Sequence, residues 1–127
     1  MRHPYDRSGS FGPTPALAVD VAFEWNGRHR TVRALIDTGA SGTLLRRSDY
    51  QALGLRKIGD AEDIGGIGGA AKAEPTIVNI TFEGFNFPNF PVMAATTDHL
   101  PVTLIGRDLL NRYLLECNGP LLEFEIR

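Results

Sequence analysis

Apolar and polar residues alternate along several stretches of the chain, and this alternation predicts strands. The first stretch covers residues 17–25, where the apolar positions are Leu17, Val19, Val21, Phe23 and Trp25. A period of two is typical of a strand with one buried side and one solvent-facing side. Asn26-Gly27 follows directly and is the strongest hairpin signal in the chain, so a return strand is expected over residues 30–36.

The same alternation returns later in the chain. Val78, Ile80 and Phe82 lie on one side of a strand expected over residues 76–82. Shorter apolar runs predict four more strands, over residues 43–45, 102–105, 114–117 and 121–126. Residues 85–97 contain two prolines, which predict an edge strand because proline donates no ladder hydrogen bond.

Helical patterns are few and short. Ser48 is a candidate cap for a helix that extends to Leu53 and ends at Gly54. Leu109, Leu110 and Tyr113 have helical spacing after Gly106, which predicts a second helix over residues 107–113. The fold class is therefore mostly β.

Length and composition fit one ordinary domain. The chain has 127 residues, and residues 1–15 are rich in Gly, Pro, Ser and Arg, so we expect a mobile tail followed by a domain over residues 16–127. A net charge of −2 gives no basic field that would attract nucleic acid. No apolar run approaches the roughly 18 residues of a membrane span, so no membrane partner is expected.

Cys117 is the only cysteine, so an intrachain disulfide is impossible and a reducing, cytoplasmic location is expected. The thiol is interpreted as a small apolar core residue. The three histidines are widely scattered and form no metal-ligand spacing with it, so neither a metal nor a cofactor is expected.

Candidate chemistry begins at Asp37, which ends the run Ala34-Leu35-Ile36 and precedes Thr38-Gly39-Ala40. Bulky apolar residues followed by turn residues place this carboxylate where a packed strand breaks into a tight loop. The alternative is an ordinary turn aspartate that accepts backbone N–H bonds.

A second feature is the glycine-rich run Ile64-Gly65-Gly66-Ile67-Gly68-Gly69. Such a segment has almost no side chains to pack, so it predicts the tip of a projecting hairpin rather than a core strand. A flexible linker and a phosphate-binding loop are the alternatives, although no Lys-Ser/Thr or dinucleotide fingerprint follows.

These features, with the run Leu104-Ile105-Gly106-Arg107-Asp108 before a short helix, occur in an order that resembles the retropepsin family of aspartic proteases. The matching segments are residues 34–44, 64–72 and 104–110, and the resemblance covers residues 17–126. It implies a closed β-barrel of the acid-protease type, with one short C-terminal helix and a projecting flap hairpin.

The resemblance also implies an activity. Peptide hydrolysis of this kind needs two carboxylates that share one proton around a water molecule. The chain has one Asp-Thr-Gly, so the pair forms only in a homodimer that brings together both copies of Asp37 and binds an extended peptide or protein substrate. Thr38, Gly39 and Ala40 complete the active-site loop.

Further roles follow from the same resemblance. The flap and substrate-binding residues are Ile64, Gly65, Gly66, Ile67, Gly68 and Gly69. Support for the loop comes from Leu104, Ile105, Gly106, Arg107 and Asp108. Retroviral relatives pair the arginine with an acidic residue after Asp-Thr-Gly-Ala, but here Ser41 and Gly42 follow, so this salt bridge is not expected. Residues 114–127 are longer than the retroviral end, which implies a different terminal sheet.

Two other functions fit parts of the pattern. A retropepsin-like peptide-binding or dimerisation module would keep the groove without proteolytic activity, and a small-ligand β-barrel would not require Asp-Thr-Gly and flap together. The intact Asp37-Thr38-Gly39 and the glycine-rich hairpin favour the peptidase.

Overall fold

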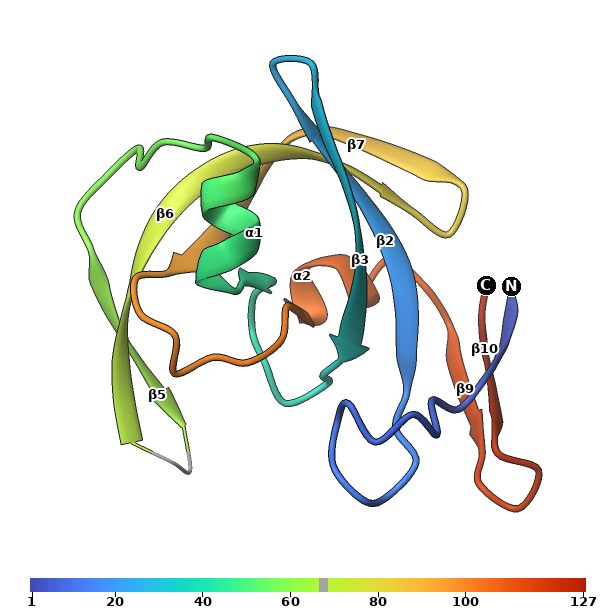
Figure 1. Ribbon diagram of the computed structural model, residues 1–127. Helices are drawn as coiled ribbons and strands as arrows, with labels where there is room; N and C mark the ends of the chain where they lie inside the picture. Colours follow the sequence, from blue (N-terminus) through green and yellow to red (C-terminus); the bar gives the residue numbers. More distant parts are fainter. Residues whose placement is uncertain (67–68) are drawn as a thin grey trace.

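The computed structural model describes residues 1–66 and 69–127, and Ile67 and Gly68 lie outside the described residues. A seven-stranded sheet has the order β2-β3-β8-β4-β7-β6-β5, and a further pairing of β2 with β6 closes it into a six-stranded barrel. Its strands are β2 (Ala18–Trp25), β3 (Arg28–Ile36), β4 (Leu44–Leu45), β5 (Glu62–Gly66), β6 (Gly69–Phe82), β7 (Phe85–Ala95) and β8 (Leu104–Ile105). The helices are α1 (Arg47–Ala52) and α2 (Arg107–Leu110) (Figure 1).

The β2–β3 hairpin forms as its pattern predicts. Val19, Val21 and Phe23 are each at most 1% exposed, whereas Asp20 and Ala22 between them are exposed. Asn26 and Gly27 have φ angles of 49° and 80°, the left-handed backbone that a two-residue hairpin turn requires. The turn joins Trp25 directly to Arg28 in the ladder.

The barrel interior is filled by apolar side chains from both ends of the chain. Phe23, Ile80, Phe82, Ile105 and Leu109 are each at most 1% exposed. Phe124 and Ile126, from the last strand, belong to the same cluster. The mostly β prediction is confirmed, and α2 is the short C-terminal helix that the resemblance implies.

Strand β8 lies between β3 and β4. It runs parallel to β3, pairing Leu35 with Leu104 and Ile36 with Ile105, and antiparallel to β4. The loop over residues 37–43, which joins β3 to β4, therefore passes the end of β8 before the chain returns to the sheet. In Figure 1 this loop lies at the lower edge of the molecule.

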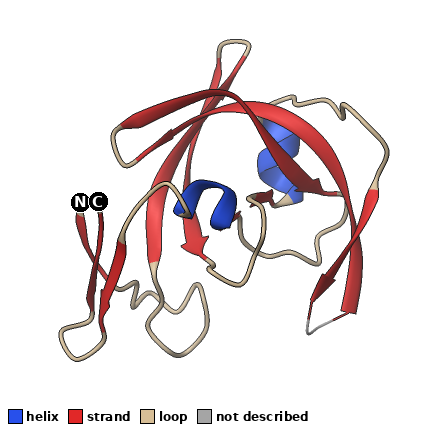
Figure 2. Ribbon diagram, turned by 180° about the vertical axis from the view of Figure 1, so that it is seen from behind, coloured by secondary structure: helices blue, strands red, loops and turns tan. Residues whose placement is uncertain are grey.

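A second, three-stranded sheet has the order β1-β10-β9 and stands beside the barrel (Figure 2). Its strands are β1 (Arg2–Pro4), β9 (Leu115–Asn118) and β10 (Glu123–Ile126). The prediction of a mobile tail therefore does not hold for residues 2–4, because β10 supplies their ladder partners. His3 Nε2 also lies 2.6 Å from Glu83 Oε1, and the Glu83 side chain is only 4% exposed.

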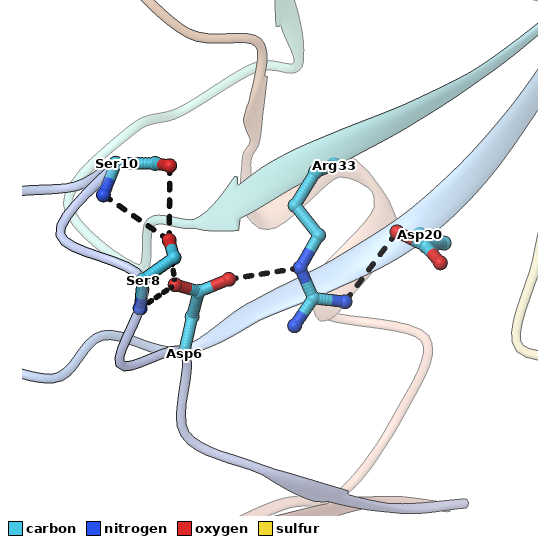
Figure 3. A network of polar contacts seen from close by, with 5 residues as sticks. All are labelled: Asp6, Ser8, Ser10, Asp20 and Arg33. Carbon is cyan, nitrogen blue, oxygen red and sulfur yellow. Dashed lines mark hydrogen bonds and ion pairs between the residues drawn. The ribbon is translucent and has the colours of Figure 1, made fainter.

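The rest of the N-terminal segment is tied to β3 (Figure 3). Asp6 accepts hydrogen bonds from the hydroxyl and N–H of Ser8 and from Arg33 Nε, at 3.0 Å for the last. These three bonds hold the pKa of the Asp6 carboxyl below its ordinary value. Asp6 also forms an isolated bridge with Ala16, so the segment between them is a closed loop.

Three smaller expectations differ from the structure. Helix α1 begins at Arg47 with Arg46 as its N-cap, so Ser48 is not the cap, while Gly54 at φ 64° does end the helix. Strand β7 lies between β4 and β6 rather than at the edge, because β4 pairs with Met93 and Ala94, beyond both prolines. Cys117 is exposed on β9 rather than packed in the core.

Within the described residues, the two helices are too short to cross a bilayer.

Candidate active site

Asp37 is held by the backbone of β8. Its N–H donates to the carbonyl of Ile105 at 3.0 Å, and its own carbonyl accepts from Ala40 at 3.2 Å. The preceding Ile36 is 8% exposed and its partner Ile105 is fully buried, so the strand end is anchored in the core. The prediction that this carboxylate follows a packed strand end is confirmed.

The carboxylate itself faces outward. Asp37 is half-buried, whereas Thr38 and Gly39 are exposed. Asp37 Oδ1 accepts a hydrogen bond from the N–H of Gly39 at 2.9 Å, which fixes the side-chain orientation. Asp37 therefore makes the hydrogen bond of an ordinary turn aspartate, with the N–H of Gly39. Its backbone is also held by Ile105 of β8.

Gly106 allows the segment over residues 104–108 to lie directly against the loop over residues 37–43. A Cβ atom at this position would lie 2.4 Å from the carbonyl oxygen of Gly42 and 3.0 Å from that of Ala40. Both neighbours are backbone atoms, so no side-chain movement relieves the overlap. The Arg107 N–H, next in the chain, donates to Ala40 at 2.9 Å.

Arg107 contacts the active-site loop through its side chain as well. Its Nη1 donates to the carbonyl oxygen of Thr38 at 2.7 Å. Among the described residues it forms no ion pair, in agreement with the absence of an acidic residue at positions 41 and 42. The guanidinium therefore holds the residue after Asp37 through a carbonyl rather than a carboxylate.

Asp108, which the resemblance implies only as support for the loop, binds Thr43 through its side chain. Its carboxylate accepts from the N–H of Thr43 at 2.9 Å and from the Thr43 hydroxyl at 2.8 Å. The same hydroxyl accepts from the N–H of Gly106 at 3.2 Å, and Thr43 is fully buried. Asp108 thus closes the far end of the loop that begins at Asp37.

The sequence did not single out Asp49, a buried carboxylate close to the start of β8. Asp49 on α1 is fully buried and accepts from Arg30 Nε at 2.6 Å, Arg46 Nε at 2.9 Å and the Thr103 hydroxyl at 2.7 Å. Thr103 directly precedes β8, and its carbonyl accepts from Leu35. Arg46 lies three residues before Asp49, whereas Arg30 and Thr103 come from distant segments that only the fold brings to this aspartate.

The glycine-rich segment forms the predicted hairpin. Strands β5 and β6 pair antiparallel from Glu62 opposite Ala73 to Gly66 opposite Gly69. Ile64 is half-buried and Gly65 is exposed, while the predicted flap residues Ile67 and Gly68 lie outside the described residues. At the base of the hairpin, the Tyr50 hydroxyl donates to Glu74 Oε2 at 2.9 Å.

The structure thus brings residues 37–43 and 104–108 into one site and places the hairpin on a separate element. In Figure 1 the free ends of β5 and β6 project toward the same lower edge as the loop after β3. Two concavities of about 420 and 430 Å³ lie elsewhere, one beside Phe23 and Phe87 and the other on β9 and β10. Neither is lined by Asp37.

Comparison with known proteins agrees with this geometry. A family model described as aspartyl protease matches residues 21–109, a range that includes the site and the hairpin but excludes β1, β9 and β10. No curated protein matched the chain.

Two solved structures are similar to this chain, one over part of it and one over its full length. The EIAV protease complexed with the inhibitor HBY-793 is 27% identical, with a TM-score of 0.61 over 76% of this chain and 86% of that one. A retropepsin-like aspartic protease from Rickettsia conorii is 22% identical, with a TM-score of 0.71 over 100% and 97%, and this likeness shows the fold. The predicted resemblance and the barrel are confirmed.

Proposed function

The chain belongs to the aspartyl protease family and is an aspartic-type endopeptidase, and from this premise we propose that it works as a homodimer with one catalytic Asp37 from each subunit. The observation that carries the proposal is the single half-buried Asp37, fixed by Ile105 and Gly39 at the surface of one subunit. One carboxylate cannot supply both the acid and the base that the reaction needs.

In the proposed mechanism the two carboxylates share one proton, because two adjacent like charges disfavour full ionisation. The unprotonated Asp37 accepts a proton from water, whose oxygen attacks the peptide carbonyl carbon. The other Asp37 donates its proton to the carbonyl oxygen. Collapse of the tetrahedral diol then breaks the C–N bond, and a proton passes to the leaving nitrogen.

The β5–β6 hairpin is proposed as the flap. An extended peptide lies between the hairpin and the active-site loop, pairing with backbone groups as an added strand. Closure of the hairpin excludes water from the reacting carbonyl. The substrate cleft is proposed to lie between the two subunits, because the mechanism needs one Asp37 from each.

The location in the cell stays a prediction. A cytoplasmic protein is what the single cysteine favours, since that compartment keeps thiols reduced.

The test is Asp37→Asn, with the exposed Asp60→Asn as the matched control for loss of one carboxylate. Asp37→Asn should lower kcat/KM by roughly 10³-fold or more and leave the free energy of unfolding nearly unchanged. Asp60→Asn should cleave a denatured protein substrate like the wild type. Cleavage by purified Asp37→Asn at the wild-type rate would remove this residue from the mechanism, and binding of peptides without any cleavage by the wild type would favour a non-catalytic binding module.

A further inference from the structure

Strand β8 is too short to fix its own position in the sheet, because it has only two residues, 104 and 105. The carbonyl of Ile105 holds the N–H of Asp37 at 3.0 Å. Two residues earlier in the same ladder, the carbonyl of Thr103 holds the N–H of Leu35 at 3.0 Å. A shift of β8 along its own direction would therefore move the carbonyl that holds Asp37. The position of Asp37 thus depends on what anchors the two ends of β8.

The end that follows β8 is anchored by Thr43. Its hydroxyl accepts from the N–H of Gly106 at 3.2 Å and donates to Asp108 on α2 at 2.8 Å. Thr43 itself directly precedes β4. This anchor therefore joins the start of one short strand to the helix that follows the other.

The end that precedes β8 has the reciprocal anchor. The hydroxyl of Thr103 accepts from the N–H of Arg46, directly after β4, at 3.1 Å. It donates to Asp49 on α1 at 2.7 Å. Strands β4 and β8 pair antiparallel, so a local two-fold axis relates the two anchors. The sequence agrees, since residues 43–45 and 103–105 both consist of a threonine and two large apolar residues.

The Asp49 side chain is fully buried and is held from three directions. Besides the Thr103 hydroxyl, it accepts from Arg30 Nε on β3 at 2.6 Å and from Arg46 Nε at 2.9 Å. Hydrogen bonds to an ionised carboxylate are stronger than bonds between neutral groups, and a fully bonded buried network is rigid. Asp49 therefore gives the Thr103 hydroxyl a fixed acceptor.

We propose that Asp49 and Thr103 are positioning residues for Asp37, holding β8 where the Ile105 carbonyl fixes the backbone of the catalytic carboxylate. This inference rests on the proposed function, in which Asp37 carries out the acid and base chemistry. Asp49 and Thr103 are both fully buried, so neither contacts the substrate. Loss of the pair should therefore slow the chemical step without weakening peptide binding.

Thr103→Val is the primary test, because valine keeps the branched shape and removes the hydroxyl. We expect kcat per active site to fall roughly 10- to 100-fold, since small displacements of a reacting group are costly, and KM to change by less than about twofold. The probe is a fluorogenic peptide that contains one cleavage site identified in denatured casein. Active sites are counted by titration with a tight-binding transition-state inhibitor, so unfolded protein does not lower the measured kcat.

Thr103→Ser is the rescue variant, since serine restores the hydroxyl and lacks only the methyl group. Its kcat per active site should stay within about threefold of the wild type, even where its free energy of unfolding falls as far as that of Thr103→Val. A purely structural role would make the two variants differ in stability alone.

Tyr113→Phe is the matched control for the loss of a hydroxyl. This hydroxyl donates to the carbonyl of Phe82 at 3.2 Å, in a contact that does not include β8. The variant should lose some stability and keep the wild-type kcat per active site.

Asp49→Asn tests the other half of the pair. Asparagine has one acceptor oxygen in place of two and sets an N–H₂ group against an arginine, so kcat per active site should fall as in Thr103→Val. The double variant should lose no more kcat than the more damaging single variant, because the two residues act as a unit. The two Thr103 variants decide the proposal whether or not Asp49→Asn folds.

Wild-type kcat per active site in Thr103→Val, a change in its KM alone, or an equal loss of kcat in Thr103→Ser would overturn this proposal and leave the proposed function intact. Cleavage by Asp37→Asn at the wild-type rate would overturn the proposed function and this inference together.

Discussion

At the scale of single residues, the position of Asp37 depends on the absence of a side chain at Gly106. The backbone of residues 40–42 passes so close that a Cβ atom would lie 2.4 and 2.5 Å from the carbonyl O and C atoms of Gly42. The same close approach lets Arg107 N–H reach the carbonyl of Ala40. Gly106 thus couples the support segment to the loop that carries the carboxylate.

Gly106→Ala should therefore reduce both stability and activity. The added methyl group forces backbone to move, at an expected cost of roughly 1–3 kcal/mol in the free energy of unfolding. Gly119→Ala is the matched control, since its Cβ would meet no atom within 4 Å and its φ is not in the left-handed region. Urea denaturation and peptidase assays of the two variants measure the difference, and equal stability and activity would contradict the close packing described here.

At the scale of elements, the β5–β6 hairpin connects to α1 through Tyr50 and Glu74. Burial raises the pKa of Tyr50 to about 12, and the hydrogen bond to Glu74 adds to this shift. Since the pKa in the folded state lies above the ordinary value of 10.0, the contribution to stability is complete below pH 10. It is lost as the pH rises toward about 12.

Alkaline titration tests this contact. Phenolate absorbance should show a late component near pH 12 that Tyr50→Phe removes. Tyr50→Phe should also lose less stability than the wild type between pH 10 and 12, because it has no proton to release there. Identical titration curves for the two proteins would rule out a buried, hydrogen-bonded Tyr50.

The hairpin itself should respond to ligand. Gly65 is exposed and contributes no side chain to packing, so its backbone hydrogen bonds are expected to open easily in the free protein. Binding of a peptide transition-state inhibitor should slow amide hydrogen exchange at Gly65 and Gly66, while core amides such as Val21 change little. Strong protection of both glycines without inhibitor would indicate a packed loop rather than a flap.

The elements that could be predicted are those specified by local pattern. The β2–β3 hairpin follows from its period of two and from Asn26-Gly27, and the stop of β8 follows from Gly106. Strand β1 could not be found in this way because its pairing partner, β10, lies at the other end of the chain. The buried Asp49 was missed for the same reason, since Arg30 and Thr103 reach it from distant segments.

At the scale of the whole molecule, the proposed homodimer takes half of its catalytic site from each chain. The β8 backbone, Arg107 and Asp108 fix the loop from 37 to 43 within the subunit, so the carboxylate is positioned before association. Arg107 binds a carbonyl instead of a carboxylate at this point.

The most direct test of the homodimeric mechanism is sedimentation and specific activity measured on the same samples over a dilution series. We predict that activity falls in proportion to the dimer fraction and that a transition-state inhibitor restores the dimer by mass action. An excess of Asp37→Asn chains should inhibit the wild type by forming heterodimers that hold a single catalytic carboxylate. Full activity in samples that sediment as monomers, unaffected by the Asp37→Asn chains, would contradict the mechanism.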